Sequence, residues 1–247
     1  EKEVPGATIV ETNTAYPGKR YTTEDHLETL HINGWDEWTK VDIMDDGDKF
    51  AYFPVEGGKW FDKMSVGANE ANYDSLVVLT HFKGHGMGGF GGSDKNLGIG
   101  CASGHEGKFW IHSSKFVSEG DTSFDILQEE LMERITESTK ATIDHFKGHI
   151  CYVNVMRNMS VDCDCAGTMA AAVTTPNVGV LSSLDICAVD TACVDIVWAM
   201  SDEEGHDLKE RIQSRKGLRQ LSYMQELGMG TMNYKLLDLD NDCAEIT

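Results

Sequence analysis

Short apolar runs alternate along this chain with segments of helical spacing, and this alternation limits the fold more than any other feature. Residues 75–82, SLVVLTHF, form a continuous apolar run, which is typical of an interior strand covered on both faces. Residues 149–156 and 178–183 read as further strands, whereas apolar residues recur every four positions through 123–147, as in a helix capped by Thr122 and Ser123. The other expected helices are one that starts at a capping box of Thr22 and Asp25, and those at about 186–200, 203–214 and 218–227. The pattern predicts an α/β fold with a largely parallel sheet flanked by helices.

Length and charge limit the organisation of the chain and its partners. At 247 residues, without a repeat or a boundary linker, we expect a single α/β domain over 1–247 or two closely packed lobes at about 1–115 and 116–247. The formal charge of −20 argues against nucleic acid and anionic membrane surfaces, because phosphate binding requires clustered cations. No apolar run is long enough for a membrane helix, so we expect a soluble, acidic protein of unspecified oligomeric state.

The seven cysteines bear on the cellular compartment. Their number is odd, they do not fall at the spacings of a disulfide framework, and most lie in apolar contexts. This usage favours a reducing compartment or an anaerobe, so we expect a cytoplasmic protein. The sequence opens EKEVPG without Met, and an exported form is therefore the alternative.

Three loops that follow predicted strands, at 13–20, 83–96 and 157–175, hold most of the unusual side chains. In open α/β sheets, ligands bind where the carboxyl ends of the strands pass into loops. We therefore expect the site at the carboxyl ends of the strands, where these three loops would meet.

The stretch 81–101, HFKGHGMGGFGGSDKNLGIGC, concentrates glycine with reactive side chains. Glycine admits positive φ and lets backbone N–H groups approach a ligand closely, although the match to a dinucleotide fingerprint lacks its acidic residue. Ser93 and Asp94 are expected to cap a helix that carries Lys95 in its first turn. A positive lysine is unfavourable at the positive end of the helix dipole, so anion binding or a covalent bond is the favoured role of Lys95. The alternative is a solvated surface lysine. The candidate cofactor-binding residues are Gly88, Gly89, Gly91 and Gly92, with Asn13 and Arg20 from the first loop.

Histidines and a cysteine pair supply the remaining chemistry. Four histidines fall between His81 and His112, and neutral imidazole suits both proton transfer and metal ligation. Cys163 and Cys165 can share one pocket only in a loop, where thiolates would bind iron, zinc or copper(I); two incidental loop cysteines are the alternative. The candidate catalytic residues are His85, Lys95 and Asn96, and the candidate metal ligands are His112, Cys163 and Cys165.

Three aspartates flank or lie within the apolar segment 186–200. Asp185 stands where a helix N-cap is expected. An unpaired carboxylate is costly to bury, so Asp190 is expected to meet a backbone amide or a lysine. Neither aspartate is therefore assigned a catalytic role.

Four ordered blocks of the sequence resemble the family catalogued as domain of unknown function 362, often labelled iron–sulfur-centre proteins. The blocks are 72–113, 154–165, 178–197 and 227–236. Many members carry a ferredoxin-like cassette, which is missing here because no cysteine lies between Cys101 and Cys151. The resemblance implies that any iron or iron–sulfur centre would rest on Cys163, Cys165 and partners from other loops. It also implies a strand–helix segment that is not seen before Glu1.

A shorter stretch, His85 with Gly89–Gly92 and Lys95, resembles the active-site region of nickel-pincer lactate racemases. That resemblance implies a proton-transfer role for His85, cofactor anchoring for Lys95 and nickel ligation for His112. We therefore predict a metal-dependent enzyme that acts on a small, anionic molecule by redox chemistry or by proton abstraction next to a carboxylate. Iron or iron–sulfur is the expected cofactor, with zinc or nickel as alternatives. The alternative function is a non-catalytic binding or scaffold protein with a structural metal or none.

Overall fold

The computed structural model describes residues 6–114 and 124–246. The chain forms two compact units, and each contains two chain segments. The first unit comprises Glu1–Leu76 and Leu97–His149, and the second comprises Val77–Asn96 and Ile150–Thr247. The single-domain and two-lobe alternatives stay predictions.

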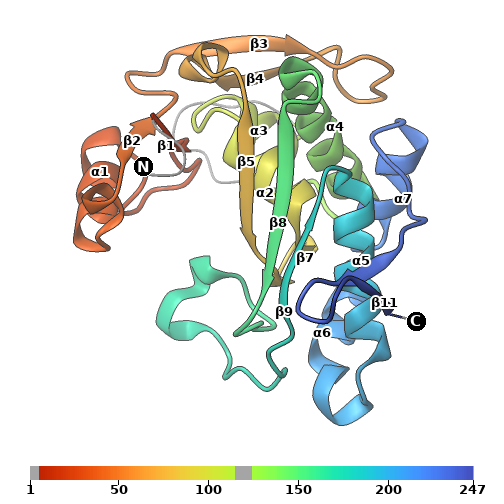
Figure 1. The fold of residues 1–247 in the computed structure, drawn as a ribbon. Helices are drawn as coiled ribbons and strands as arrows, with labels where there is room; N and C mark the ends of the chain where they lie inside the picture. Colours follow the sequence, from red (N-terminus) through yellow and green to blue (C-terminus); the bar gives the residue numbers. More distant parts are fainter. Residues whose placement is uncertain (1–5, 115–123, 247) are drawn as a thin grey trace. The chain divides into compact units, whose positions relative to one another are not determined.

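The first unit combines short strand pairs with helices (Figure 1). Its strands are β1 (Thr8–Glu11), β2 (Lys40–Ile43), β3 (Phe50–Pro54) and β4 (Lys63–Gly67). Its helices are α1 (Thr23–Ile32), α3 (Gly107–His112) and α4 (Gln128–Phe146), with the short η1 (Trp35–Glu37) and η2 (Ala68–Asn72). Strand β1 pairs parallel with β2, whereas β3 pairs antiparallel with β4.

Local signals position the helices of this unit. The Thr22 side chain caps α1 by accepting from the backbone amide of Asp25, as the sequence predicts. Helix α4 begins at Gln128, five residues after the predicted start, and the predicted cap at Thr122 and Ser123 lies outside the described residues. Residues spaced four apart along α4, such as Leu131 and Ile135, are buried, and the helix packs against α3, β3 and β4.

The second unit is built on a three-stranded sheet (Figure 1). Its strands are β5 (Leu76–His81), β6 (Lys83–His85), β7 (Gly89–Gly91), β8 (Ile150–Met156), β9 (Gly179–Ser183), β10 (Leu236–Asp238) and β11 (Ala244–Ile246). Its helices are α5 (Ile186–Ala199), α6 (Asp202–Ser214) and α7 (Arg219–Glu226), with the short η3 (Asp164–Met169). Helix α2 (Ser93–Gly100) begins in this unit and ends in the first.

The α/β class is confirmed, but the strands are distributed over several small sheets instead of one largely parallel sheet. The main sheet has the order β5-β8-β9, and β9 runs antiparallel to β8. Strands β6 and β7 also pair antiparallel, as do β10 and β11. Connections as short as the one between β6 and β7 cannot cross over a sheet, so they produce antiparallel pairs.

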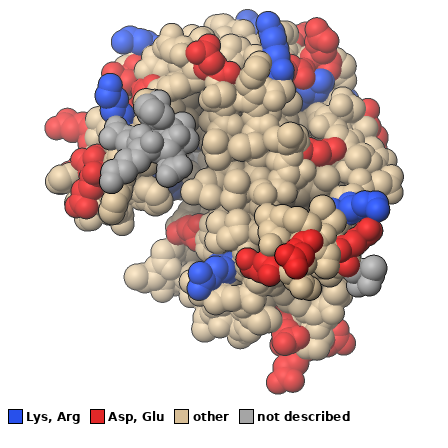
Figure 2. Space-filling view, in the orientation of Figure 1, with Lys and Arg blue, Asp and Glu red and all other residues tan. Residues whose placement is uncertain are grey.

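Strand β5 is covered on one face, which corrects the prediction that both faces are buried. Val78 and Thr80 are buried, whereas Val77 and Leu79 are 65% and 62% exposed. On β9, Val180 is 60% exposed. Helix α5 packs against β8 and β9, and much of the surface over the main sheet in Figure 2 carries no charged side chain. A continuous apolar run therefore did not require cover on both faces.

Glu70, in η2, is a buried carboxyl whose ionisation opposes folding. Burial raises the pKa of Glu70 to about 8, and the neighbouring Thr142 hydroxyl offsets only part of this. The folded state therefore keeps a proton that the unfolded state releases near pH 4.5, so this group reduces stability as the pH rises from about 4.5 to about 8.

Glu70→Gln is expected to reduce the pH dependence of the free energy of unfolding between about pH 5 and pH 8, because the amide does not ionise. Urea denaturation at several pH values measures the slope. The matched control is Glu56→Gln, at an exposed glutamate of the same unit, which should leave the slope unchanged. Equal slopes in the two variants would contradict the burial argument.

Candidate functional site

The glycine-rich stretch, predicted as a loop, forms a β-hairpin. Lys83 pairs with Gly91 and His85 pairs with Gly89 across the antiparallel strands β6 and β7. The Gln220 side chain donates to the carbonyl of Gly88 at 2.8 Å and thereby holds the turn. Helix α2 begins at Ser93, and Lys95 lies in its first turn as predicted. Ser93 and Asp94 are the first two residues of the helix instead of the expected cap, and the Asp190 carboxylate accepts both of their backbone N–H bonds.

Two of the candidate cofactor-binding glycines are sites of close packing. A Cβ atom at Gly92 would lie 2.5 Å from the Asp190 carboxylate. Gly89 has a φ of 78°, and a Cβ atom there would lie 2.8 Å from Gly217. These two glycines are therefore explained by backbone packing, independently of any ligand.

The other two candidate glycines lie under the Lys95 side chain. Cβ atoms at Gly88 and Gly91 would each lie 3.6 Å from Cδ of Lys95, and the one at Gly88 would lie 3.3 Å from Nδ1 of His85. The hairpin thus brings the stem of Lys95 close to the His85 ring. The Lys95 stem and the His85 ring therefore both lie against glycine residues of the hairpin.

The loop after β8 carries a disulfide between Cys163 and Cys165. Asp164, between the two cysteines, binds the loop to residues of strands β5 and β6. Its carboxylate lies 2.9 Å from Nζ of Lys83 and 3.2 Å from Nδ1 of His81. Partial burial acts to raise the pKa of Asp164, but the hydrogen bonds from His81 and Lys83 outweigh it and lower the pKa to about 2.

Further contacts hold the cysteine loop to helix α6 and to the glycine hairpin. Nη1 of Arg211, on α6, donates to the carbonyl of Val161 at 2.9 Å and to the carboxylate of Asp162 at 3.1 Å. The backbone amide of Gly84 donates to the carbonyl of Ser160 at 2.8 Å. A Cβ atom at Gly84 would lie 2.1 Å from the Val161 carbonyl oxygen, so glycine permits this close approach. The cysteine loop and the hairpin are therefore docked by backbone contact.

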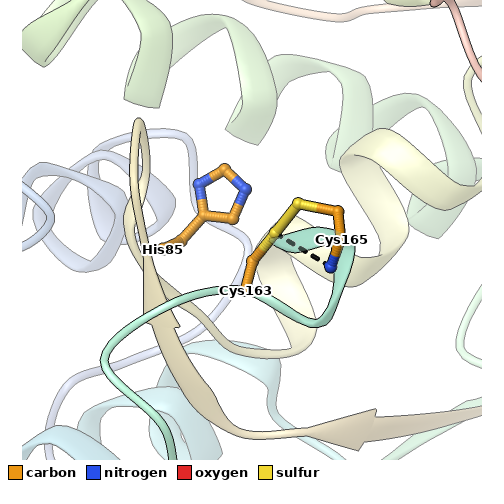
Figure 3. A group of neighbouring side chains, drawn as sticks. All are labelled: His85, Cys163 and Cys165. Atoms are coloured by element: carbon orange, nitrogen blue, oxygen red, sulfur yellow. Dashed lines mark hydrogen bonds between the residues drawn. A yellow bond between two sulfur atoms is a disulfide. The ribbon is translucent and has the colours of Figure 1, made fainter. Parts of the chain in front are cut away.

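His85 and the cysteine pair form a compact group (Figure 3). One ligand-type atom of each residue lies within 4.8 Å of the others. Nδ1 of His85 accepts backbone N–H bonds from Met87 at 3.2 Å and from Gly88 at 2.8 Å. An amide can only donate, so the neutral ring carries its proton on Nε2, on the edge that faces the cysteines in Figure 3. In this arrangement the Nε2–H group of His85 points toward the pair.

The remaining candidate residues have identifiable partners. The Asn96 amide donates to the Thr80 hydroxyl at 2.9 Å and to the Leu79 carbonyl at 3.1 Å, which ties α2 to β5. His112 belongs to the first unit, where its Nδ1 lies 2.8 Å from the Lys108 carbonyl oxygen and its ring stacks on Phe124.

Asn13 and Arg20 also belong to the first unit. Asn13 belongs to a buried network, in which its side-chain Oδ1 accepts from Nδ1 of the His26 ring at 3.2 Å and its backbone N–H donates to Asp45 at 3.0 Å. Arg20 lies 4.0 Å from the carboxylate of Glu11. Of the predicted site residues in the second unit, His85 and the two cysteines therefore come together, and the Lys95 stem lies against glycines of the same hairpin.

Sequence reasoning missed the buried Lys108 of α3. Burial lowers the pKa of Lys108 to about 8, against the opposing effect of Asp45 and Glu11. Its Nζ donates to the Thr12 hydroxyl at 2.7 Å and to the carbonyl of Asn13. The Lys108 side chain thus binds the two residues that directly follow β1. Its position in the apolar segment GKFWIH is the one local signal of burial.

These features define an α/β protein with a cysteine pair, an imidazole and a lysine assembled on a glycine hairpin. The chain belongs to the family described as Domain of unknown function (DUF362), whose model matches residues 2–195. The predicted family is therefore confirmed. No helix among the described residues is long and apolar enough to cross a membrane.

The chain has no match among curated proteins. Among solved structures it is similar to the lactate racemase apoprotein from Thermoanaerobacterium thermosaccharolyticum, at 14% sequence identity and a TM-score of 0.45. The similarity covers 78% of this chain, which corresponds to 40% of the length of that protein.

Proposed function

We propose that this protein is a metal-dependent enzyme that acts on a small anionic molecule at the cysteine loop and glycine hairpin. The observation that carries the proposal is the meeting of two sulfur atoms and an imidazole nitrogen within 4.8 Å. When the disulfide is reduced, Cys163 and Cys165 offer two soft ligands from one loop. Two soft thiolates suit iron, an iron–sulfur centre, zinc or nickel, and the imidazole lies beside them as a hydrogen-bond donor.

The accessibility of the sulfur pair favours a reactive site over a structural metal site. Cys165 is exposed and Cys163 is half-buried, so two thiolates leave coordination positions open toward solvent. Structural zinc sites are instead closed by four protein ligands. The alternative of a non-catalytic scaffold predicts that metal removal lowers stability without changing the binding of small anions.

His85 is proposed to act as a hydrogen-bond donor. The two amide donors on its Nδ1 hold the neutral tautomer with the proton on Nε2, so metal ligation through Nε2 would require both amide bonds to break. A neutral imidazole donor stabilises negative charge that develops on a substrate oxygen. Lys95, whose stem lies beside the same ring, would bind the anionic group. This arrangement would stabilise the negative charge that forms on a substrate oxygen when a base removes a proton next to a carboxylate, and redox chemistry is the second reaction class.

Metal analysis tests the proposal. Protein reduced with a phosphine under anaerobic conditions and dialysed separately against Fe²⁺, Zn²⁺ or Ni²⁺ should retain about one equivalent of one of these metals per chain. The double variant Cys163→Ser with Cys165→Ser should retain less than about a tenth of that. The matched control is Cys243→Ser, which removes an exposed free cysteine and should retain the full equivalent. Equal metal content in the double variant would overturn the proposal.

A further inference from the structure

We infer that Cys163 and Cys165 are a reversible dithiol/disulfide couple that exchanges two electrons with an external dithiol, and that only its reduced form binds the metal. The second half of this inference rests on the proposed function, whereas the first does not. The two sulfur atoms are bonded to each other in the structure, and a sulfur in a disulfide is not available as a thiolate ligand. Metal binding and the disulfide are therefore alternative states of one pair of atoms.

Accessibility and the existing disulfide together select this pair among the cysteines, because Cys243 is exposed but is not part of a disulfide. Cys165 is exposed, so an external thiolate can approach its sulfur. Cys101, Cys187 and Cys193 are buried, and burial raises the pKa of each thiol. Buried, protonated thiols react slowly with oxidants and disulfides. Exchange is thus directed to the cysteine loop.

The surroundings of the loop allow the bond to open without dispersing the two sulfurs. Asp164 is held by Lys83 and His81, and Asp162 is held by Arg211. These contacts involve the residues beside the cysteines and do not involve the sulfur atoms. The loop therefore stays docked next to His85 in both redox states.

The external dithiol supplies the two electrons and two protons that reduction of the disulfide requires. Its first thiolate attacks Sγ of Cys165, the bond between the two protein sulfurs breaks, and Cys163 leaves as a thiolate that receives a hydrogen bond from Nε2 of His85. The second thiolate of the reductant then attacks the reductant sulfur that is bonded to Cys165. Cys165 leaves as a thiolate, and the reductant is released as a disulfide. Two protons pass from the reductant to the protein sulfurs, directly or through solvent, and two electrons pass with them.

Native-state thiol trapping tests the redox couple. Folded wild-type protein treated with dithiothreitol and then with a maleimide should gain two additional labels, located by peptide mass at Cys163 and Cys165, and diamide should abolish them. The Cys243→Ser variant should gain the same two. His85→Phe should slow the reduction about tenfold, because a hydrogen bond to the leaving thiolate is lost. The control His206→Phe, at an exposed histidine, should not slow it. Failure of the wild-type pair to cycle would overturn the inference.

Zinc binding to the dithiothreitol-reduced and the diamide-oxidised protein tests whether the disulfide excludes the metal. Reduced wild-type protein should bind about one equivalent of Zn²⁺, and diamide-oxidised protein should bind less than about a tenth of this. Equal binding by both preparations would overturn the exclusion of metal by the disulfide. Cycling of the pair without metal binding in either state would overturn the proposed metal function and its redox control, and would leave the dithiol/disulfide couple established.

Discussion

Asp190→Ala should lower the free energy of unfolding by about 3–5 kcal/mol. The Asp190 carboxylate is fully buried and accepts backbone N–H bonds from Ser93 at 2.8 Å and from Asp94 at 2.9 Å, with a third bond from the Asn154 amide at 2.7 Å. Alanine would leave these three donors buried without an acceptor. Burial raises the pKa of Asp190 to about 6 despite these bonds, so the group is ionised at neutral pH.

Urea denaturation at pH 7.5 measures this effect, and the midpoint of thermal unfolding should fall by roughly 10 °C. The matched control is Asp195→Ala in the same helix, where an exposed carboxylate accepts one hydrogen bond from the Tyr234 hydroxyl. The control should change the free energy of unfolding by less than about 1 kcal/mol. Similar losses in the two variants would contradict the role assigned to Asp190 at the start of α2.

Glu137→Ala should destabilise the protein by a similar amount, about 3–5 kcal/mol. The fully buried Glu137 carboxylate of α4 accepts backbone N–H bonds from three successive residues, Lys59 at 2.7 Å, Trp60 at 3.0 Å and Phe61 at 2.9 Å. Alanine has no side-chain acceptor to replace the carboxylate at residues 59–61. The three amides would therefore remain unpaired or the turn would detach from α4.

Calorimetry of Glu137→Ala beside Glu129→Ala provides the comparison. Glu129 is exposed in the first turn of the same helix, so its loss removes only a favourable interaction with the helix dipole, worth less than about 1 kcal/mol. Increased proteolysis at residues 59–61 in Glu137→Ala alone would support the mechanism. An unchanged thermal midpoint in Glu137→Ala would contradict it.

Signals confined to a few neighbouring residues were predictable from the sequence. The Thr22 cap and the Asp185 cap depend on a hydroxyl or carboxylate and on an amide three residues later, and both are confirmed. The requirement that a buried carboxylate be paired predicted a backbone amide partner for Asp190, although not which amides. Helices α5, α6 and α7 also lie close to their predicted positions.

Features that depend on long-range partners were not predictable. The docking of the glycine hairpin depends on the close approach of Gly84 to Val161, which lies far away in the sequence. The exposure of Val77 and Leu79 depends on which elements pack on the sheet, and an apolar run does not contain that information. The pairing of Asp164 with Lys83 likewise became visible only in three dimensions.

The site shows the same division. The sequence identified the residue types, namely His85, Lys95 and the cysteine pair. The tautomer of His85 could not be predicted, because it follows from two backbone amides in the turn of the hairpin. That detail changes the role of His85 from the expected proton transfer to a proposed hydrogen-bond donation through Nε2.

X-ray absorption at the metal edge of the reduced, metal-loaded protein tests the central claim most directly. The account predicts two sulfur ligands at about 2.3 Å, supplied by Cys163 and Cys165, with the remaining positions filled by lighter atoms. The Cys243→Ser variant should give the same spectrum. A first coordination shell without sulfur, or one unchanged in the double variant Cys163→Ser with Cys165→Ser, would contradict a metal centre at the cysteine loop.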